Sequence, residues 1–200
     1  MAYAQYANAN KGSFPYNGRK IPNVVDPGGQ DLSWNSAVQQ QFWQDWLIKN
    51  RSLEMRDKDN VLFCPSQTWH REIQNDTTLA GGLMGYFNFP YRDPTDPFNQ
   101  MDYTAKNTWT DGIGWVTRKK MAGQWKLAPI MSDMLQTDNG AAGWGRYSSH
   151  LTRAIIPSGG NFLFEDGHVA WYVYSPIPSA TEIAVGATEG SWQCWYRIKI

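Results

Sequence analysis

Two segments near the start of the chain carry the residue spacing of an amphipathic helix. Residues 33–50 repeat an apolar side chain at every fourth position, and these side chains are Trp34, Val38, Phe42 and Trp46. Gln39 and the other glutamines between them fall on other faces of that helix. Within residues 1–12, Tyr3 and Tyr6 share one helical face, and the last residue is a glycine, which is typical after a helix end. The pattern therefore predicts a helix over 33–50 and the end of a helix within the first twelve residues.

Short apolar runs bounded by turn-forming residues follow along the rest of the chain and predict β-strands. They cover residues 61–64, 83–91, 113–118, 127–132, 181–185 and 191–199. Two stretches rich in proline and polar turn formers, 13–32 and 92–112, predict long connections. Helices that precede a set of strands are typical of an α+β fold. We therefore expect one α+β domain over residues 1–200, with a helix packed on an antiparallel sheet with irregular loops.

The strongest local pattern predicts a β-hairpin over residues 161–174. Two apolar runs flank Asp166-Gly167, and this dipeptide suits a two-residue type I′ turn, in which both central residues have positive φ. A two-residue loop fixes the register, and the pairs on one face are then Phe164 with Val169 and Phe162 with Trp171. We expect these four side chains to face the core.

The composition narrows the classes of function. The chain of 200 residues has 18 basic and 18 acidic side chains. It lacks the excess of lysine and arginine that neutralises phosphates, so we expect no nucleic-acid partner. No segment approaches the roughly 20 apolar residues of a membrane helix, and the first residues lack the basic and apolar regions of a signal peptide. The 11 tryptophans, 10 tyrosines and 8 phenylalanines can fill a core or, where exposed, stack on sugar rings.

Three side chains near the predicted hairpin raise the question of catalysis or metal binding: His150, Asp166 and His168. Imidazole and carboxylate groups suit zinc or iron. However, Asp166 is explained by the turn, no His-Glu-x-x-His pair is present, and no Gly-x-Ser-x-Gly nucleophile motif occurs. We interpret the three as a hydrogen-bonded cluster that locks the preceding loop onto the turn. No catalytic residue is expected, and a metal-dependent enzyme that uses them is the third hypothesis.

Cys64 and Cys194 are the two cysteines of the chain. A bridge between them would close a loop of about 130 residues and stabilise the fold by several kcal/mol. Two buried thiols fit the sequence equally well. Asp133 and Asp138 lie among turn-forming residues, and their carboxylates are the candidate ligands of a structural Ca²⁺ ion. Apart from that calcium ion we expect no cofactor.

Three segments, in order along the chain, resemble pilin-like proteins. Residues 5–15 resemble the segment that ends the long N-terminal helix of type II secretion pseudopilins and related type IV pilin-like proteins. Residues 62–66 resemble the Cys-Pro-Ser segment of one pilin-like family. Residues 159–171 are similar to the C-terminal signature of that family, the prepilin-type processing-associated domain, in which a histidine precedes Asp-Gly. The motif positions matched here are Gly160, Asn161, Asp166, Gly167 and His168. The spacing of the family places its histidine at Ile156, and the nearest upstream histidine of this chain is His150.

The resemblance implies a pilin-like fold and a non-enzymatic structural subunit of a secretion pseudopilus or surface filament. The implied partners are other pseudopilin or pilin subunits and the secretion machinery. It also implies that the apolar start of the helix and the prepilin peptidase cleavage site lie upstream of this chain. That helix would anchor the full-length protein in the inner membrane, with the globular domain in the periplasm or outside the cell. The alternative hypothesis is a secreted carbohydrate-binding module with exposed tryptophan and tyrosine rings.

Overall fold

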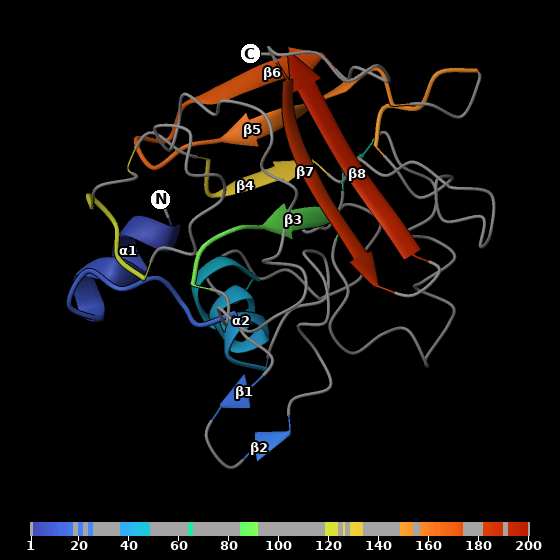
Figure 1. Cartoon of the computed structure of the whole chain (residues 1–200). Helices are drawn as coiled ribbons and strands as arrows, with labels where there is room; N and C mark the ends of the chain where they lie inside the picture. Colours follow the sequence, from blue (N-terminus) through green and yellow to red (C-terminus); the bar gives the residue numbers. More distant parts are fainter. Residues whose placement is uncertain are drawn as a thin grey trace.

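The protein forms two short helical segments and eight strands within the part of the chain that the structure, a computed structural model, describes (Figure 1). The described residues are 2–17, 20–21, 24–25, 37–48, 64–65, 85–91, 119–123, 126, 129–133, 149–153, 157–173, 182–189 and 192–199. The helical elements are α1 (Ala2–Ala9), α2 (Ala37–Phe42) and η1 (Trp43–Ile48), a π-helical continuation of α2. None of the helices in these ranges is long and apolar enough to cross a bilayer.

A four-stranded antiparallel sheet forms the centre of the fold. Its strands lie in the order β3 (Tyr86–Asn88), β4 (Met131–Asp133), β5 (Gly159–Leu163) and β6 (Val169–Val173). Two further antiparallel pairs are β1 (Lys20–Ile21) with β2 (Val24–Val25), and β7 (Glu182–Glu189) with β8 (Trp192–Lys199). β8 contacts β6, as Figure 1 also shows. The α+β class expected from the sequence is therefore present.

Several of the predicted strands are present in the structure. β3 lies within 83–91, β4 overlaps 127–132, and β7 and β8 match the two C-terminal predictions. Cys64 is buried but lies outside any strand. The predicted strands at 61–63 and 113–118 lie outside the described residues.

Helix α1 is held by one buried face. Tyr3 and Ala7, one turn apart, are buried, and the phenol O–H of Tyr3 donates to Asn88 Oδ1 on β3 at 2.7 Å. The Tyr3 ring also packs on Phe42 and Trp43, with ring centroids 4.8 and 5.8 Å away. The helix ends in a left-handed turn, where Gly12, with a φ of 79°, donates its N–H to the carbonyl of Ala7. The predicted helix end is thus confirmed.

The second helical segment corrects one prediction. Phe42 is buried as expected, but Gln39, expected on another face, is buried as well. Its amide donates to the hydroxyl of Tyr3 at 3.0 Å, so the hydrogen bonds to α1 replace those to water. In the wider π-helical turn that follows, Trp43 is buried next to Phe42.

The hairpin over 161–174 is present, but its register is not the predicted one. β5 and β6 pair Leu163 with Val169, Phe162 with Ala170, and Asn161 with Trp171. The loop has three residues, Glu165 to Gly167. Gly167 donates its N–H to the carbonyl of Phe164, and within this loop Gly167 alone has a positive φ, of 91°. This is a three-residue hairpin loop with a left-handed glycine, so the expected type I′ turn is wrong.

The added loop residue decides which side chains of β6 are buried. A shift of one residue moves every side chain of a strand to the opposite face. Phe162 and Phe164 are buried as predicted, whereas Val169 and Trp171 are 57% and 46% exposed. Their expected core position is therefore wrong. Tyr172 takes an inner position instead, with its ring 5.3 Å from that of Phe162.

Candidate functional site

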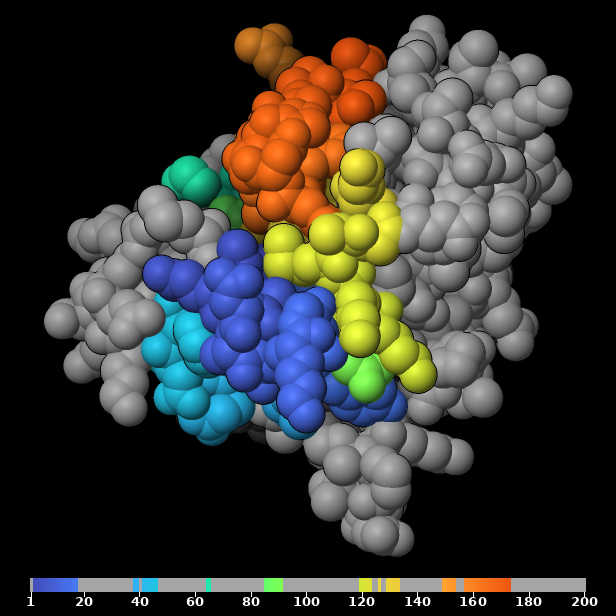
Figure 2. All heavy atoms as spheres, turned by 90° about the vertical axis from the view of Figure 1, so that its left-hand side faces the viewer, coloured from blue at the N-terminus to red at the C-terminus, as the bar shows by residue number. Residues whose placement is uncertain are grey.

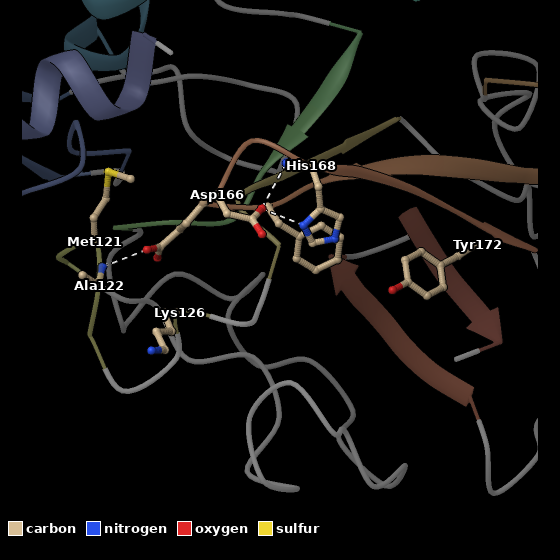
Figure 3. A pocket seen from close by; sticks show the side chains of 8 residues that line it. Met121, Ala122, Lys126, Asp166, His168 and Tyr172 are labelled. Atoms are coloured by element: carbon tan, nitrogen blue, oxygen red, sulfur yellow. Dashed lines mark hydrogen bonds and ion pairs between the residues drawn. The ribbon is translucent and has the colours of Figure 1, made fainter.

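The tip of the Asp-Gly hairpin is held by its own side chains. Asp166 Oδ1 accepts hydrogen bonds from the backbone N–H of His168 at 3.0 Å and from its ring Nδ1 at 2.6 Å (Figure 3). The backbone bond first, and the ring bond second, hold the pKa of Asp166 below its usual value. The His168 ring stacks on Phe164, with centroids 4.2 Å apart. Both side chains are exposed, so this pair shapes the turn at the surface.

Residues 119–123 connect this tip to the end of helix α1. Glu165 Oε2 accepts the backbone N–H of Ala122 at 2.8 Å, drawn as a dashed line in Figure 3. On the other side, Phe14 donates its N–H to the Lys119 carbonyl at 2.9 Å, and Met121 donates to the Gly12 carbonyl at 3.0 Å. The signature hairpin and the helix end are therefore joined through one short segment.

An open pocket lies beside the hairpin tip (Figure 3). Its lining residues are Met121, Ala122, Lys126, Phe164, Glu165, Asp166, His168 and Tyr172. Asp166 and His168 are hydrogen-bonded to each other. These lining residues include no serine, threonine or cysteine, the side chains that most often serve as nucleophiles in covalent catalysis.

A second polar cluster is centred on Asp133, a buried residue at the end of β4. Its Oδ2 accepts three N–H groups: Asn161 N at 2.7 Å, Asn161 Nδ2 at 2.8 Å and His150 Nε2 at 2.9 Å. Cys64 Sγ lies 3.7 Å from the same Nε2 of His150. The side chains of Asp133 and His150 are 4% and 21% exposed, so the cluster touches solvent only on the histidine side.

The position of His150 is set by its backbone and by Trp171. Its φ of 53° is uncommon for a residue with a side chain, and its carbonyl accepts from both the N–H and the hydroxyl of Ser158. The imidazole meets the Trp171 ring edge-on, with centroids 4.9 Å apart. Trp171 in turn lies on Gly159, where an added Cβ would come within 2.7 Å of the indole ring. Gly160, the next residue, is buried opposite Tyr172.

The geometry of this cluster does not match a catalytic triad. A cysteine–histidine–aspartate triad uses one ring nitrogen toward the nucleophile and the other toward the carboxylate. Here Cys64 and Asp133 approach the same Nε2 of His150. The thiol, carboxylate and imidazole ligand atoms all lie within 4.8 Å of one another, so these three residues can hold a metal ion.

The structure divides the side chains that the sequence grouped together. His150, Asp166 and His168 do not form one cluster: His150 joins Asp133 and Cys64, while the other two pair at the hairpin tip. The interpretation that His150 locks onto the turn is therefore wrong. Its partners Asp133 and Cys64 are 17 and 86 residues upstream of it, and no local spacing pattern indicated these contacts.

The predicted calcium site and the predicted disulfide each depend on one side chain that lies outside the described residues. Asp133, a predicted calcium ligand, lies in a strand with a nitrogen and a sulfur beside its carboxylate, whereas Asp138 lies outside the described residues. Cys64 is present as a thiol. The Cys194 side chain lies outside the described residues.

Comparison with known proteins adds no assignment. No family model, no curated protein and no solved structure matches the chain. The resemblance of the three sequence segments to pilin-like proteins therefore stays a prediction. A function has to be argued from the contacts described above.

Proposed function

We propose that the protein is a non-enzymatic, pilin-like structural subunit of a secretion pseudopilus or a surface filament. The observation that carries this proposal is the connection from the end of α1, through residues 119–123, to the Asp-Gly hairpin. It joins the two segments that resemble pilin-like proteins, 5–15 and 159–171, into one hydrogen-bonded unit. A subunit that transmits load between a helix and a globular domain needs such a connection.

The contacts of the signature residues support a structural role. Asp166 is hydrogen-bonded to His168, Gly167 supplies the positive φ of the loop, and Asn161 orients a buried carboxylate. Each of these residues has a conformational task that needs no substrate. This favours a non-enzymatic subunit over a metal-dependent enzyme that uses His150, Asp166 and His168.

The outer face of α1 suits contact with neighbouring subunits. Figure 2 shows α1 in dark blue at the surface, between the α2–η1 segment and the described residues 119–123, 126 and 129–133. Its exposed residues carry no charge, and they are Ala4, Gln5, Asn8 and Ala9. Helices with small, uncharged outer faces can approach one another without burying a charge.

In this proposal the full-length form carries an apolar helix ahead of α1 and is anchored by it in the inner membrane. The globular domain would lie in the periplasm or outside the cell, against other pilin-like subunits and the secretion machinery. A helix of that kind needs about 20 apolar residues.

The coding sequence upstream of residue 1 tests this proposal directly. We expect a short basic leader, a small residue at the cleavage point and a long apolar helix in frame. Co-expression of the full reading frame with a prepilin peptidase should remove the leader and leave the product in the membrane fraction. A reading frame that starts at Met1, or one processed by the general signal peptidase alone, would contradict the proposal.

Cross-linking tests the proposed contact between subunits. A Gln5→Cys variant of the full-length protein should form intersubunit disulfides in assembled filaments. Lys126→Cys, at an exposed position in the pocket beside the hairpin, is the matched control and should cross-link less. Equal cross-linking of both variants, or none at position 5, counts against a helix-mediated assembly.

The carbohydrate-binding alternative rests on Trp171, which is exposed on the outer face of β6. Sugar-binding surfaces that use stacking present several aromatic rings on one face. Within the described part of the chain, the other large apolar side chains that are exposed are aliphatic: Val169 and Val173, each two residues from Trp171 on β6, and Leu151. The pilin-like proposal is therefore the one we retain, and binding of the purified chain to polysaccharide, lost in Trp171→Ala, would overturn it.

A further inference from the structure

The buried cluster of Cys64, Asp133 and His150 is explained neither by the hairpin nor by the proposed assembly. We propose that these three residues bind a zinc ion. This proposal is independent of the pilin-like function, since it rests on other residues and another readout. The three side chains come from a loop, from strand β4 and from a second loop, and Cys64 and His150 are 86 residues apart. An ion at this place would tie three separate segments together.

The spacing of the ligand atoms fits a tetrahedral ion. Zinc lies about 2.3 Å from sulfur and about 2.0–2.2 Å from nitrogen or oxygen, so its ligand atoms are roughly 3.2–3.7 Å from one another. The distance from Cys64 Sγ to His150 Nε2 is 3.7 Å, and from that nitrogen to Asp133 Oδ2 it is 2.9 Å. All three ligand atoms lie within 4.8 Å of one another. On binding, the nitrogen–oxygen separation of 2.9 Å would widen by about half an ångström, and the sulfur and the carboxylate oxygen would come to about 3.6 Å from each other.

The types of ligand select the metal. A thiolate, an imidazole and a carboxylate are the set that zinc accepts, whereas calcium and magnesium prefer oxygen alone. This set of residues is therefore unsuited to the calcium ion expected from the sequence. His150 is 21% exposed, so a water molecule can reach the fourth coordination position from the histidine side.

The surroundings already orient two of the three ligands. Both N–H groups of Asn161 hold the carboxylate of Asp133, at 2.7 and 2.8 Å. Ser158 anchors the backbone of His150, and the Trp171 ring fixes the plane of the imidazole. Outer groups of this kind set ligand geometry in metal sites and typically change metal affinity by about 10–100-fold when they are lost.

Zinc binding forms three bonds between the ion and the protein and releases one proton to solvent. The ion forms bonds to Cys64 Sγ, His150 Nε2 and the carboxylate of Asp133. The thiol proton leaves to solvent, and the Nε2 proton is replaced by one on Nδ1, so that one proton is released for each zinc ion. The hydrogen bond between Nε2 and Asp133 is lost, while the two bonds from Asn161 remain.

The first test uses the whole purified chain without any substitution. After treatment with a chelator it is titrated with Co²⁺, as a spectroscopic probe, and then with Zn²⁺. We expect one metal ion per chain, a thiolate-to-cobalt absorption band that zinc abolishes, and a rise in Tm with zinc that an excess of Ca²⁺ does not reproduce. A stoichiometric ion without the thiolate band, or no binding above that of an unrelated control protein, overturns the proposal.

Substitutions locate the ion. Cys64→Ser, and separately His150→Gln, should lower zinc affinity by at least about 100-fold, and Asn161→Ala by about 10–100-fold. The matched controls are His168→Gln and Asp166→Asn, which alter the exposed pair at the hairpin tip and should leave zinc affinity unchanged. Circular dichroism of each metal-free variant verifies that it folds, and Cys64→Ala is a second probe if the serine variant does not. Loss of binding in the control variants, with binding kept in Cys64→Ser, would place the ion at the hairpin and refute the assignment.

Discussion

His150 Nε2 donates to Asp133 Oδ2 across 2.9 Å and so ties an otherwise strained loop residue to the buried end of strand β4. The same oxygen accepts both N–H groups of Asn161 on β5. One carboxylate thus links strands β4 and β5 and the loop residue His150, which lies between them in the chain. This relationship carries the first prediction.

Replacing Asp133 by alanine should lower the free energy of unfolding by about 2–4 kcal/mol. The substitution leaves two half-buried N–H groups of Asn161 without this acceptor, and each unsatisfied donor that is shielded from water costs up to about 1–3 kcal/mol. Urea denaturation of the metal-free chain measures the change. Asp45→Ala is the control, because Asp45 accepts an exposed bond from Gln41 on the helix surface and should cost less than about 1 kcal/mol. Equal losses in the two variants would show that Asp133 has no special role.

Gly159→Ala should destabilise the sheet by about 1–3 kcal/mol. A Cβ at this position would lie 2.4 Å from the carbonyl oxygen of Tyr172 and 2.7 Å from the indole of Trp171. That carbonyl belongs to the paired strand β6 and cannot move without distorting the β5–β6 ladder. At Gly123 the nearest atom would be 3.6 Å from an added Cβ, so Gly123→Ala should be close to neutral. Thermal unfolding of the two variants tests the difference, which disappears if β6 can shift freely.

Tyr3 should make the protein sensitive to alkaline pH. Burial raises the pKa of Tyr3 well above its ordinary value near 10, and the hydrogen bond from Gln39 offsets only part of that rise. The stability linked to this raised pKa is complete below about pH 10 and is lost as the pH rises above it, because the unfolded chain ionises first. Tyr3→Phe should therefore flatten the decline above pH 10. It should also cost about 1–3 kcal/mol at neutral pH, since it removes the bonds to Asn88 and Gln39. Chemical denaturation at pH 8 and at pH 11 separates the two effects.

Asp166 should stabilise the protein less at acidic pH, which is the opposite of the pH dependence expected from Tyr3. Its pKa lies below the ordinary value of 3.8, first because of the backbone N–H of His168 and then because of the ring. Its contribution is therefore present above about pH 4 and is lost as the pH falls through the lowered pKa. NMR titration of the carboxyl group should give a midpoint below 3.8, and His168→Ala should raise that midpoint only partly, because the backbone bond remains. Full return to 3.8 in that variant would assign the shift to the ring instead.

The hairpin shows which structural features local sequence patterns predict and which they do not. The alternation of apolar residues and the Asp-Gly pair located both strands correctly, because those signals arise within a few neighbouring residues. The two registers differ in whether Asp166 and Gly167 both take a positive φ, as expected, or Gly167 alone does, as observed. In the observed register, Glu165 accepts a hydrogen bond from Ala122, which lies outside the hairpin. A distant contact therefore accompanies the register that exposes Trp171.

Of the two buried residues described in α2, the sequence predicted the burial of Phe42 but not that of Gln39. Phe42 lies on the apolar face that the spacing of four predicted. Gln39 was expected on another face, yet it is buried because Tyr3 and Asn88, from two other elements, offer it hydrogen bonds. Propensity and periodicity say nothing about partners supplied by distant segments.

The sequence by itself determined the end of helix α1, the α+β class and the location of the Asp-Gly hairpin, because each depends on side chains within one turn or one loop. The membership of the Cys64, Asp133 and His150 cluster was decided by the tertiary structure alone. These residues come from segments far apart in the chain, and only the pairing of β4 with β5 brings Asp133 beside Asn161 and His150. Contacts between distant segments depend on the packing of the whole sheet, and no local spacing encodes them.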